Sequence, residues 1–503
     1  MLRSIWSISS LLIGIGILMV GSGLIGMLIG LRGVAEGFSN FTLGLIMSGY
    51  YSGYIAGAWL CPILIRRVGH VRCFASFAAM AAIVTLSFGM FIDPWLWILL
   101  RMFNGLAVMG IYMVIESWLN ERAQSNPSSQ ASIFAVYMVV NLIGVAAGQY
   151  MITIHGATAL ESFAIAAILF CMGLLPIALT PVPQPLPIAS PKMSLMALAR
   201  KTPSGVAGAL CSGLVSGAFW ALTPVYGRAL TFSDIEIANL TAAAIMGGAL
   251  MQWPIGWLSD HRDRREVLIA VALGSTVSMF ALSMLDRWLE VGSPNHYIAV
   301  SFLMGGFLFS IYAMAVAQTA DRFPAHEALE ATRGLLLLHG VGAAVGPILS
   351  STAMQFGGPR GFPQSVAAMT GLLVFFVWYR LRAEPPVPKE ERSPFQMATD
   401  HISPVAMEMD PRADSPLATP SADGSAAAEA KAEQASEQAA AAAAAAVAVA
   451  QSAASSATEA VAESAVASEA AADPRATDVA RPEAAVGTTM ETGAHSLPVR
   501  PQE

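Results

Sequence analysis

Residues 101–122 read RMFNGLAVMGIYMVIESWLNER, and residues 301–322 read SFLMGGFLFSIYAMAVAQTADR. With a shift of 200 positions, four identities and one acidic match recur: Gly105, Ile111, Tyr112 and Arg122 become Gly305, Ile311, Tyr312 and Arg322, and Glu121 becomes Asp321. Each stretch is mostly apolar and long enough to cross a bilayer as a helix. The repeat indicates a chain built from two similar halves.

A second pair supports the duplication. Gly144-Val-Ala-Ala-Gly148 recurs as Gly342-Ala-Ala-Val-Gly346, shifted by 198 positions. Two pairs in the same order at nearly one offset favour a six-plus-six arrangement of helices. Parallel halves of this kind place a substrate path along their interface near the bilayer midplane.

The composition agrees with a membrane-embedded body. The 503 residues are 55% hydrophobic and 12% charged, whereas soluble domains are about 25% charged. A span needs about 20 mostly apolar residues. This length predicts twelve transmembrane helices, all-α, in two pseudo-symmetric six-helix halves, over residues 7–31, 41–65, 73–92, 95–119, 131–154, 161–180, 204–227, 235–258, 266–285, 297–319, 331–355 and 363–381.

The domains follow from these spans. We expect an N-terminal six-helix half at 1–180, a cytoplasmic linker at 181–203, a C-terminal six-helix half at 204–382 and a tail at 383–503. The tail holds 7 basic and 19 acidic groups, and no Phe, Tyr or Trp follows Phe395. Such a segment cannot bury enough apolar surface to offset its ordering entropy. We therefore expect a disordered, acidic, Ala-rich cytoplasmic tail that the body does not need for folding.

Lysine and arginine in short loops set the orientation, because they favour the cytoplasm. With the N-terminus inside, thirteen basic residues fall on the inner side and four on the outer side. The inner ones are Arg3, Arg66, Arg67, Arg72, Arg122, Lys192, Arg200, Lys201, Arg262, Arg264, Arg265, Arg322 and Arg333, and the outer ones are Arg32, Arg228, Arg287 and Arg360. This bias predicts a multi-pass protein of the cell inner membrane with both termini in the cytoplasm.

The connection after the eighth expected span carries a recognisable pattern. It reads Gly256-Trp-Leu-Ser-Asp260-His-Arg-Asp263-Arg264-Arg265. A glycine, a following Asp and paired basic residues around a turn resemble the signature loop of the major facilitator superfamily, and the resemblance covers residues 7–382. It implies a cytoplasmic gate in which Asp260, Arg264 and Arg265 take part. Asp263 departs from the pattern, since the family commonly has Gly there.

The equivalent loop of the first half is degenerate. It reads Pro62-Ile-Leu-Ile-Arg66-Arg67-Val-Gly69-His, so that Pro62 replaces the first Gly and Arg66 replaces the Asp. A gate latched through Asp would therefore depend on the second-half loop. The alternative is that both basic clusters only determine topology.

Arg101 lies about two turns beyond Pro94, within the apolar zone. An intramembrane Arg costs several kcal/mol unless it faces a cavity or a partner. Arg101-Met-Phe-Asn104-Gly105 also resembles the family's Arg-x-x-x-Gly pattern, which implies a role in proton coupling. The alternative is an Arg that snorkels to the interface.

Glu116 lies about 22 Å from Arg101 along the same helix, too far to pair directly. Near the cytoplasmic end, it could be a protonation site or a gate partner, or it could form a structural ion pair. His339 could titrate near neutral pH or pack as a hydrogen-bonded residue. The family's exporters carry Gly-x-x-x-Gly-Pro in the fifth helix, but Gln149 follows Gly148 here, which weakens an export assignment.

Polar and aromatic residues on the expected cavity-lining helices suit an uncharged or weakly charged organic solute, although each could instead pack or bridge helices. The candidates for the substrate cavity are Tyr51, Tyr54, Asn141, Trp220, Tyr226, Asn239, Gln252, Tyr312 and His339, with Tyr50 beside them.

The expected function is secondary active transport of a small organic solute by alternating access, with proton linkage. We expect no enzyme activity, cofactor, metal or nucleic-acid partner, because the sequence holds no phosphate-cradling loop, Cys/His metal pattern or catalytic nucleophile motif. We expect a monomer in the lipid bilayer. The alternative is a non-transporting membrane sensor or scaffold whose tail is the partner surface.

Overall fold

The computed structural model describes residues 9–124, 130–179, 195–288 and 294–383, together with Pro388, Arg392 and Phe395. All of them lie in one compact unit, Met1–Ala446. Twelve helices of 19 residues or more lie in this part of the chain, accompanied by two short ones. Most of the expected linker and tail falls outside the described residues.

The first half holds six long helices and one short helix, α7. Their bounds are α2 Ser9–Ala35, α3 Asn40–Val68, α4 His70–Met90, α5 Pro94–Gln124, α6 Gln130–Tyr150, α7 Ile152–His155 and α8 Leu160–Ala178.

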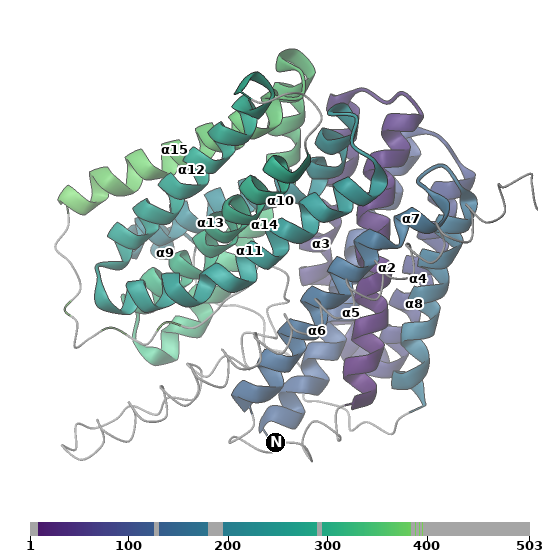
Figure 1. Ribbon diagram of the computed structural model, residues 1–503. Coiled ribbons are helices and arrows are strands. Elements are labelled where there is room, and N and C mark those ends of the chain that lie inside the picture. Colours follow the sequence, from purple (N-terminus) through teal and green to yellow (C-terminus); the bar gives the residue numbers. More distant parts are fainter. Residues whose placement is uncertain are drawn as a thin grey trace, which may run out of the picture. The chain divides into compact units, whose positions relative to one another are not determined.

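A short helix, α9, lies in the expected linker, and six long helices follow it in the described part of the second half (Figure 1). Their bounds are α9 Leu195–Lys201, α10 Pro203–Ala229, α11 Asp234–His261, α12 Arg264–Trp288, α13 Pro294–Ala320, α14 Ala325–Gly357 and α15 Gly361–Ala383.

Eleven of the long described helices are both long and apolar enough to cross a membrane. The remaining one, α3, is long enough to be a twelfth span. The run Ser48-Gly-Tyr-Tyr-Ser-Gly-Tyr54 makes α3 more polar than the others. The outward faces are apolar, as lipid contact requires. For example, Trp59 is 66% exposed and Leu372 is 71% exposed. The all-helical membrane fold predicted from the sequence is therefore confirmed.

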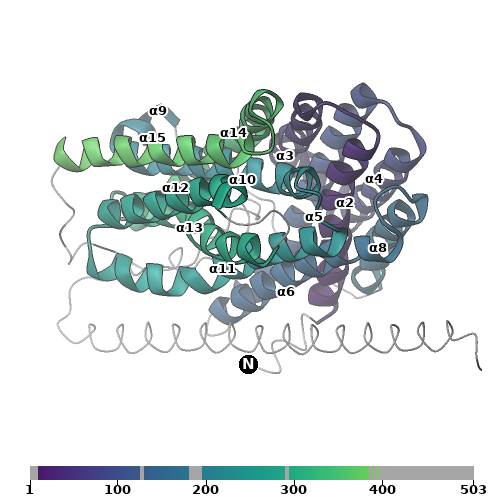
Figure 2. The same ribbon diagram turned by 45° about the horizontal axis from the view of Figure 1, so that its top comes forward.

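The packing order is the same in both halves. In the first, α2 packs against α6 and α8, α3 against α5, and α4 against α5 and α8. In the second, α10 packs against α14 and α15, α11 against α13, and α12 against α13 and α15. Figure 2 shows the first set in purple to blue and the second in teal to green. Matched helices thus make matched contacts, as a duplicated chain should.

The recurring glycines lie where matched helices approach most closely. A Cβ atom on Gly105 of α5 would overlap the Tyr50 carbonyl of α3, and one on Gly305 of α13 would overlap the Ala244 carbonyl of α11. Helices in lipid associate through such small residues, because dispersion contacts replace the hydrophobic drive. The repeat read from the sequence therefore marks the helix contacts on which each half depends.

The halves meet through α3 with α14, α2 with α10 and α6 with α11. We call the side where α2 begins and α15 ends the terminal side. On the opposite side, the Tyr150 hydroxyl of α6 donates to Asn239 Oδ1 of α11 at 2.9 Å. On that same side Gly44 of α3 lies against Ser351 of α14. The halves are therefore in contact on the side opposite to the terminal side.

Candidate functional site

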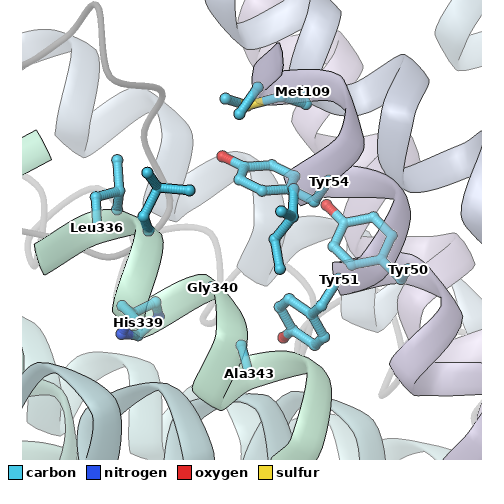
Figure 3. Close-up of a pocket in the computed structure, with 11 residues that line it drawn as sticks. Tyr50, Tyr51, Tyr54, Met109, Leu336, His339, Gly340 and Ala343 are labelled. Carbon is cyan, nitrogen blue, oxygen red and sulfur yellow. The ribbon is translucent and has the colours of Figure 1, made fainter. Parts of the chain in front are cut away.

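A cavity lies between α3 of the first half and α14 of the second, on the terminal side of the Gly44–Ser351 contact. Its empty volume is about 570 Å³, including space open to solvent. The lining residues are Tyr50, Tyr51, Tyr54, Ile55, Ala58, Met109, Leu336, Leu337, His339, Gly340 and Ala343. Figure 3 shows the tyrosines on one ribbon opposite His339 and Gly340 on the other. The cavity is thus built by both halves.

The helical spacing of α3 explains why its tyrosines face the cavity. Tyr51, Tyr54 and Ala58 follow one another at three and four residues, which places them on one face of the helix. Gly53 and Gly57 turn to α5, where Gly53 meets the Met102 backbone. One face of α3 therefore presents glycines to α5, and another face presents tyrosines to α14.

The three phenol rings form a cluster. The Tyr50 ring centroid is 5.2 Å from that of Tyr51 and 6.0 Å from that of Tyr54. Aromatic pairs at such distances are favourable beyond the area that they bury. The cluster presents a mostly apolar surface with hydroxyl groups at its edge.

Arg101 lies directly behind this cluster, in α5. Its side chain is 6% exposed, and Nη1 donates to Asn104 Oδ1 at 2.9 Å. Its guanidinium carbon lies 4.8 Å from the centroid of the Tyr50 ring, and Nη2 lies 3.5 Å from Met47 Sδ. The side chain therefore points into the bundle between α3 and α5, which is not the geometry of a snorkelling residue.

Equivalent positions of the two halves hold a tyrosine and a polar partner. Tyr112 of α5 and Asn141 of α6 exchange hydrogen bonds at 3.2 and 3.3 Å. Tyr312 of α13 and His339 of α14 pack edge to face, with ring centroids 5.0 Å apart. His339 is shifted from Asn141 by 198 residues, the same shift as the glycine repeat. Of these two pairs, the one in the second half reaches the cavity lining.

Glu116 is fully buried near the terminal end of α5. Its Oε1 accepts a hydrogen bond of 2.5 Å from the Tyr137 hydroxyl of α6. A phenol hydroxyl is an uncharged hydrogen-bond donor. The carboxyl group thus lies in the interior of the helix bundle, where it accepts a hydrogen bond from a neutral side chain of another helix.

The α11–α12 loop, by which we mean residues 256–265 and thus the adjoining ends of both helices, holds the charged cluster read from the sequence. Arg264 Nε lies 2.6 Å from Asp321 Oδ2, and these side chains are 1% and 3% exposed. Arg264 also lies 3.8 Å from Asp260 Oδ1, while Arg265 pairs with Asp263 at 2.8 Å. Asp321 belongs to the repeated acidic-Arg pair, which directly follows α13, so the structure joins the two patterns in one cluster.

The pKa values of Asp263 and of Arg322, which lies just after α13, reflect this crowding. Burial by itself would raise the pKa of Asp263, but hydrogen bonds from Arg265 and nearby guanidinium charges outweigh it and lower that pKa. Burial and the charge of Arg265 lower the pKa of Arg322. In the first-half loop, by contrast, Arg66 and Arg67 are exposed.

The other cavity candidates lie away from the cavity lining. The Tyr226 hydroxyl donates to the Leu282 carbonyl at 3.3 Å, and Trp220 packs on Phe219 and Phe309. Gln252 is buried in α11, and Asn239 accepts the inter-half bond from Tyr150. None of these four residues is among those that line the cavity.

Sequence reasoning missed the apolar lining and two contacts of the segment after α15. Met109 and Leu336 carry no polar signal that distinguishes them from core residues. Arg392 Nη1 donates to the Arg262 carbonyl at 2.6 Å, and the Phe395 amide donates to Asp260 Oδ1 at 2.8 Å. The sequence signal that could have revealed the second contact is Phe395 itself, an isolated aromatic residue among polar ones.

Comparison with known proteins agrees with this architecture. A family model described as Major Facilitator Superfamily matches residues 205–464. The uncharacterized MFS-type transporter YcaD of Shigella flexneri serotype 5b (strain 8401) is 27% identical over 351 residues, covering 69% of this chain and 88% of that protein. YcaD of Escherichia coli O139:H28 (strain E24377A / ETEC) is 28% identical over 353 residues with the same coverage.

The solved structure of the nucleoside transporter NupG shares the fold. Its TM-score is 0.62 at 14% identity, and the match covers 75% of this chain and 99% of that one. The family model covers just over half of the chain. The architecture of this family agrees with the two matched halves, with the cavity between them and with the charged cluster at the α11–α12 loop. The chain belongs to the major facilitator superfamily.

Proposed function

We propose that this protein is a secondary active transporter that carries a small organic solute across the cell inner membrane by alternating access, linked to protons. Membership of the family supports secondary transport in general. The observation that carries the finer proposal is the cavity itself, which α3 and α14 line from opposite halves with three tyrosines and a histidine. A site shared by two halves is the arrangement that alternating access requires.

The chemistry of the lining favours an uncharged or weakly charged solute. Among the eleven lining residues there is no Asp, Glu, Lys or Arg, and His339 is the one histidine. Tyrosine rings offer flat apolar surface with a hydroxyl at the edge. A solute with a planar or apolar body and a few hydrogen-bonding groups would match this surface.

The contacts between the halves support one of the two conformations of alternating access, the inward-open one. Asn239 with Tyr150 and Gly44 with Ser351 close the side opposite to the termini. The excess of basic residues on the terminal side supports a cytoplasmic location for that side. We therefore assign this structure to the arrangement that opens inward, with both termini cytoplasmic.

Two buried ionisable groups of the first half supply candidates for proton linkage. Glu116 accepts a hydrogen bond from the Tyr137 hydroxyl inside the helix bundle. Arg101 contacts the ring of Tyr50, which lines the cavity. Intramembrane ionisable residues mark ion or proton pathways because their burial is otherwise costly. We assign proton binding to Glu116 and communication with the cavity to Arg101. Asp260, Arg264 and Arg265 serve as gate residues in this proposal.

A metabolite-accumulation screen tests the proposal. Deletion cells are compared with cells that produce the wild type, Tyr54→Ala, His339→Ala or the control Tyr226→Phe, whose hydroxyl contacts the Leu282 carbonyl away from the cavity. We expect the level of one solute to differ from that in deletion cells when the wild type or the control is produced, and not to differ when either cavity variant is produced. A protonophore should abolish the gradient of this solute. If no solute level depends on the protein, the sensor or scaffold hypothesis replaces this one.

A further inference from the structure

Two described residues beyond α15, Arg392 and Phe395, contact the α11–α12 loop. Phe395 donates its backbone N–H to Asp260 Oδ1 at 2.8 Å. Arg392 donates from Nη1 to the carbonyl of Arg262, the C-cap residue of α11, at 2.6 Å. These two residues thus engage the loop through separate hydrogen bonds.

The Phe395 ring adds a close apolar contact. It covers Gly256, where any Cβ atom would overlap the edge of the ring, and the ring packs against the buried core. Gly256 is the glycine that opens the loop pattern read from the sequence. In this structure its lack of a side chain makes room for a residue of the segment after α15.

The charge of Arg392 fits the loop. Its side chain lines a small polar hollow together with the carboxylates of Asp263 and Asp321 and with Arg264, Arg265 and Gln318. The guanidinium group contributes to the attraction that favours the ionised form of Asp263. A cation beside the C-terminal end of α11 is also favoured by the helix dipole. The backbone, the ring and the charge therefore all match the same surface.

We propose that Arg392 and Phe395 form an intramolecular latch that fastens the start of the tail to the α11–α12 loop. With the latch engaged, Asp260 is held by a backbone amide of the same half, and the terminal end of α11 keeps its present neighbours. Release of the latch frees Asp260 to pair elsewhere. The latch thus couples the tail to the gate, and it does not depend on which solute is carried.

Distance measurements between two spin labels test the latch without any solute. The labels are placed at Pro388→Cys and at the exposed Glu266→Cys of α12, in a background whose four native cysteines are replaced. We expect one narrow distance component in the parent protein. Phe395→Ala should lose it, and Gly256→Ala should also lose it, because the new methyl group displaces the ring. Phe356→Ala, which removes a ring that is 87% exposed, is the matched control and should keep it.

A variant pair isolates the Asp260 contact. Asp260→Asn keeps an oxygen acceptor for the Phe395 amide and should retain the narrow component, whereas Asp260→Ala should lose it. A narrow component that persists in both Phe395→Ala and Gly256→Ala would overturn the latch.

Truncation separates the latch from the rest of the tail. A chain that ends at Met397 retains both latch residues and should melt at the temperature of the full-length protein, whereas a chain that ends at Ala383 should melt lower. Equal melting of the two truncated chains would contradict the proposal. Failure of the accumulation screen would leave these results unchanged, so the latch and the transport proposal can fail separately.

Discussion

Replacing Arg101 by alanine tests the link between the cavity and the buried charge. The change removes the 2.9 Å bond to Asn104 and the contact with the Tyr50 ring. A hydrogen bond to a charged group is worth roughly 1.5–3 kcal/mol, and a cation over an aromatic ring roughly 0.5–2 kcal/mol. The burial cost of the guanidinium, several kcal/mol, is recovered at the same time. We therefore expect similar membrane abundance.

Transport should respond differently from abundance. If the bond to Asn104 helps to hold Tyr50 in its transport-competent position, its loss corresponds to roughly a ten- to hundredfold fall in flux, at about 1.4 kcal/mol per factor of ten. Proton-driven accumulation should fall, while exchange of labelled for unlabelled solute should fall less. Arg101→Lys should restore only part of the accumulation, because Lys lacks the planar donor fork.

The assay compares both modes of transport in vesicles at matched protein levels. Arg72→Ala, which removes an exposed arginine of α4, is the control and should transport like the wild type. A double-mutant cycle with Asn104→Ala measures the coupling between the two residues. Wild-type accumulation in Arg101→Ala would refute the assigned role.

Three further changes probe the proton site, the helix contacts and the loop. Tyr137→Phe removes the hydrogen bond to Glu116, so the pH profile of flux should change; an unchanged pH profile would remove Glu116 from the pathway. Gly105→Ala places a methyl group on the Tyr50 carbonyl and should cost about 1–3 kcal/mol of stability, seen as lower heat resistance, whereas Gly26→Ala, which meets no neighbour within 4 Å, should not. The pKa of Asp263 is lowered from 3.8, so its stabilisation is present above pH 3.8 and disappears as the pH falls through the folded pKa. The melting temperatures of wild type and Asp263→Asn should accordingly differ at neutral pH and converge in acid, and a constant difference would contradict this assignment.

The spans could be predicted because bilayer thickness dictates their length and composition. Expected and observed ends differ by at most six residues. The largest difference is at the start of α14, which begins at Ala325 rather than 331 because a polar first turn precedes its apolar part. The repeat also predicted the matched packing, since glycines at close helix contacts leave a pattern in the chain.

The site could be predicted only in part. Tyr51 and Tyr54 follow helical spacing, and Arg101 stands out as a charge in an apolar helix. The rotation of each helix about its own axis decides which polar residues reach the cavity, and packing fixes that rotation. Tyr226 therefore looks like a cavity residue in the sequence but bonds to α12. The contact of Phe395 with Gly256 joins residues far apart in the chain, so no local pattern predicts it.

Alternating access is tested most directly by fixing the two halves together on the side that is closed here. Tyr150→Cys and Asn239→Cys replace the hydrogen-bonded pair of α6 and α11, and a bifunctional maleimide joins them in the cysteine-replaced background. The account predicts that the cross-linked protein loses flux of the solute found by the accumulation screen. The single-cysteine proteins and the double variant treated with a monofunctional maleimide should retain it. Undiminished flux through a fully cross-linked protein would contradict alternating access in this chain.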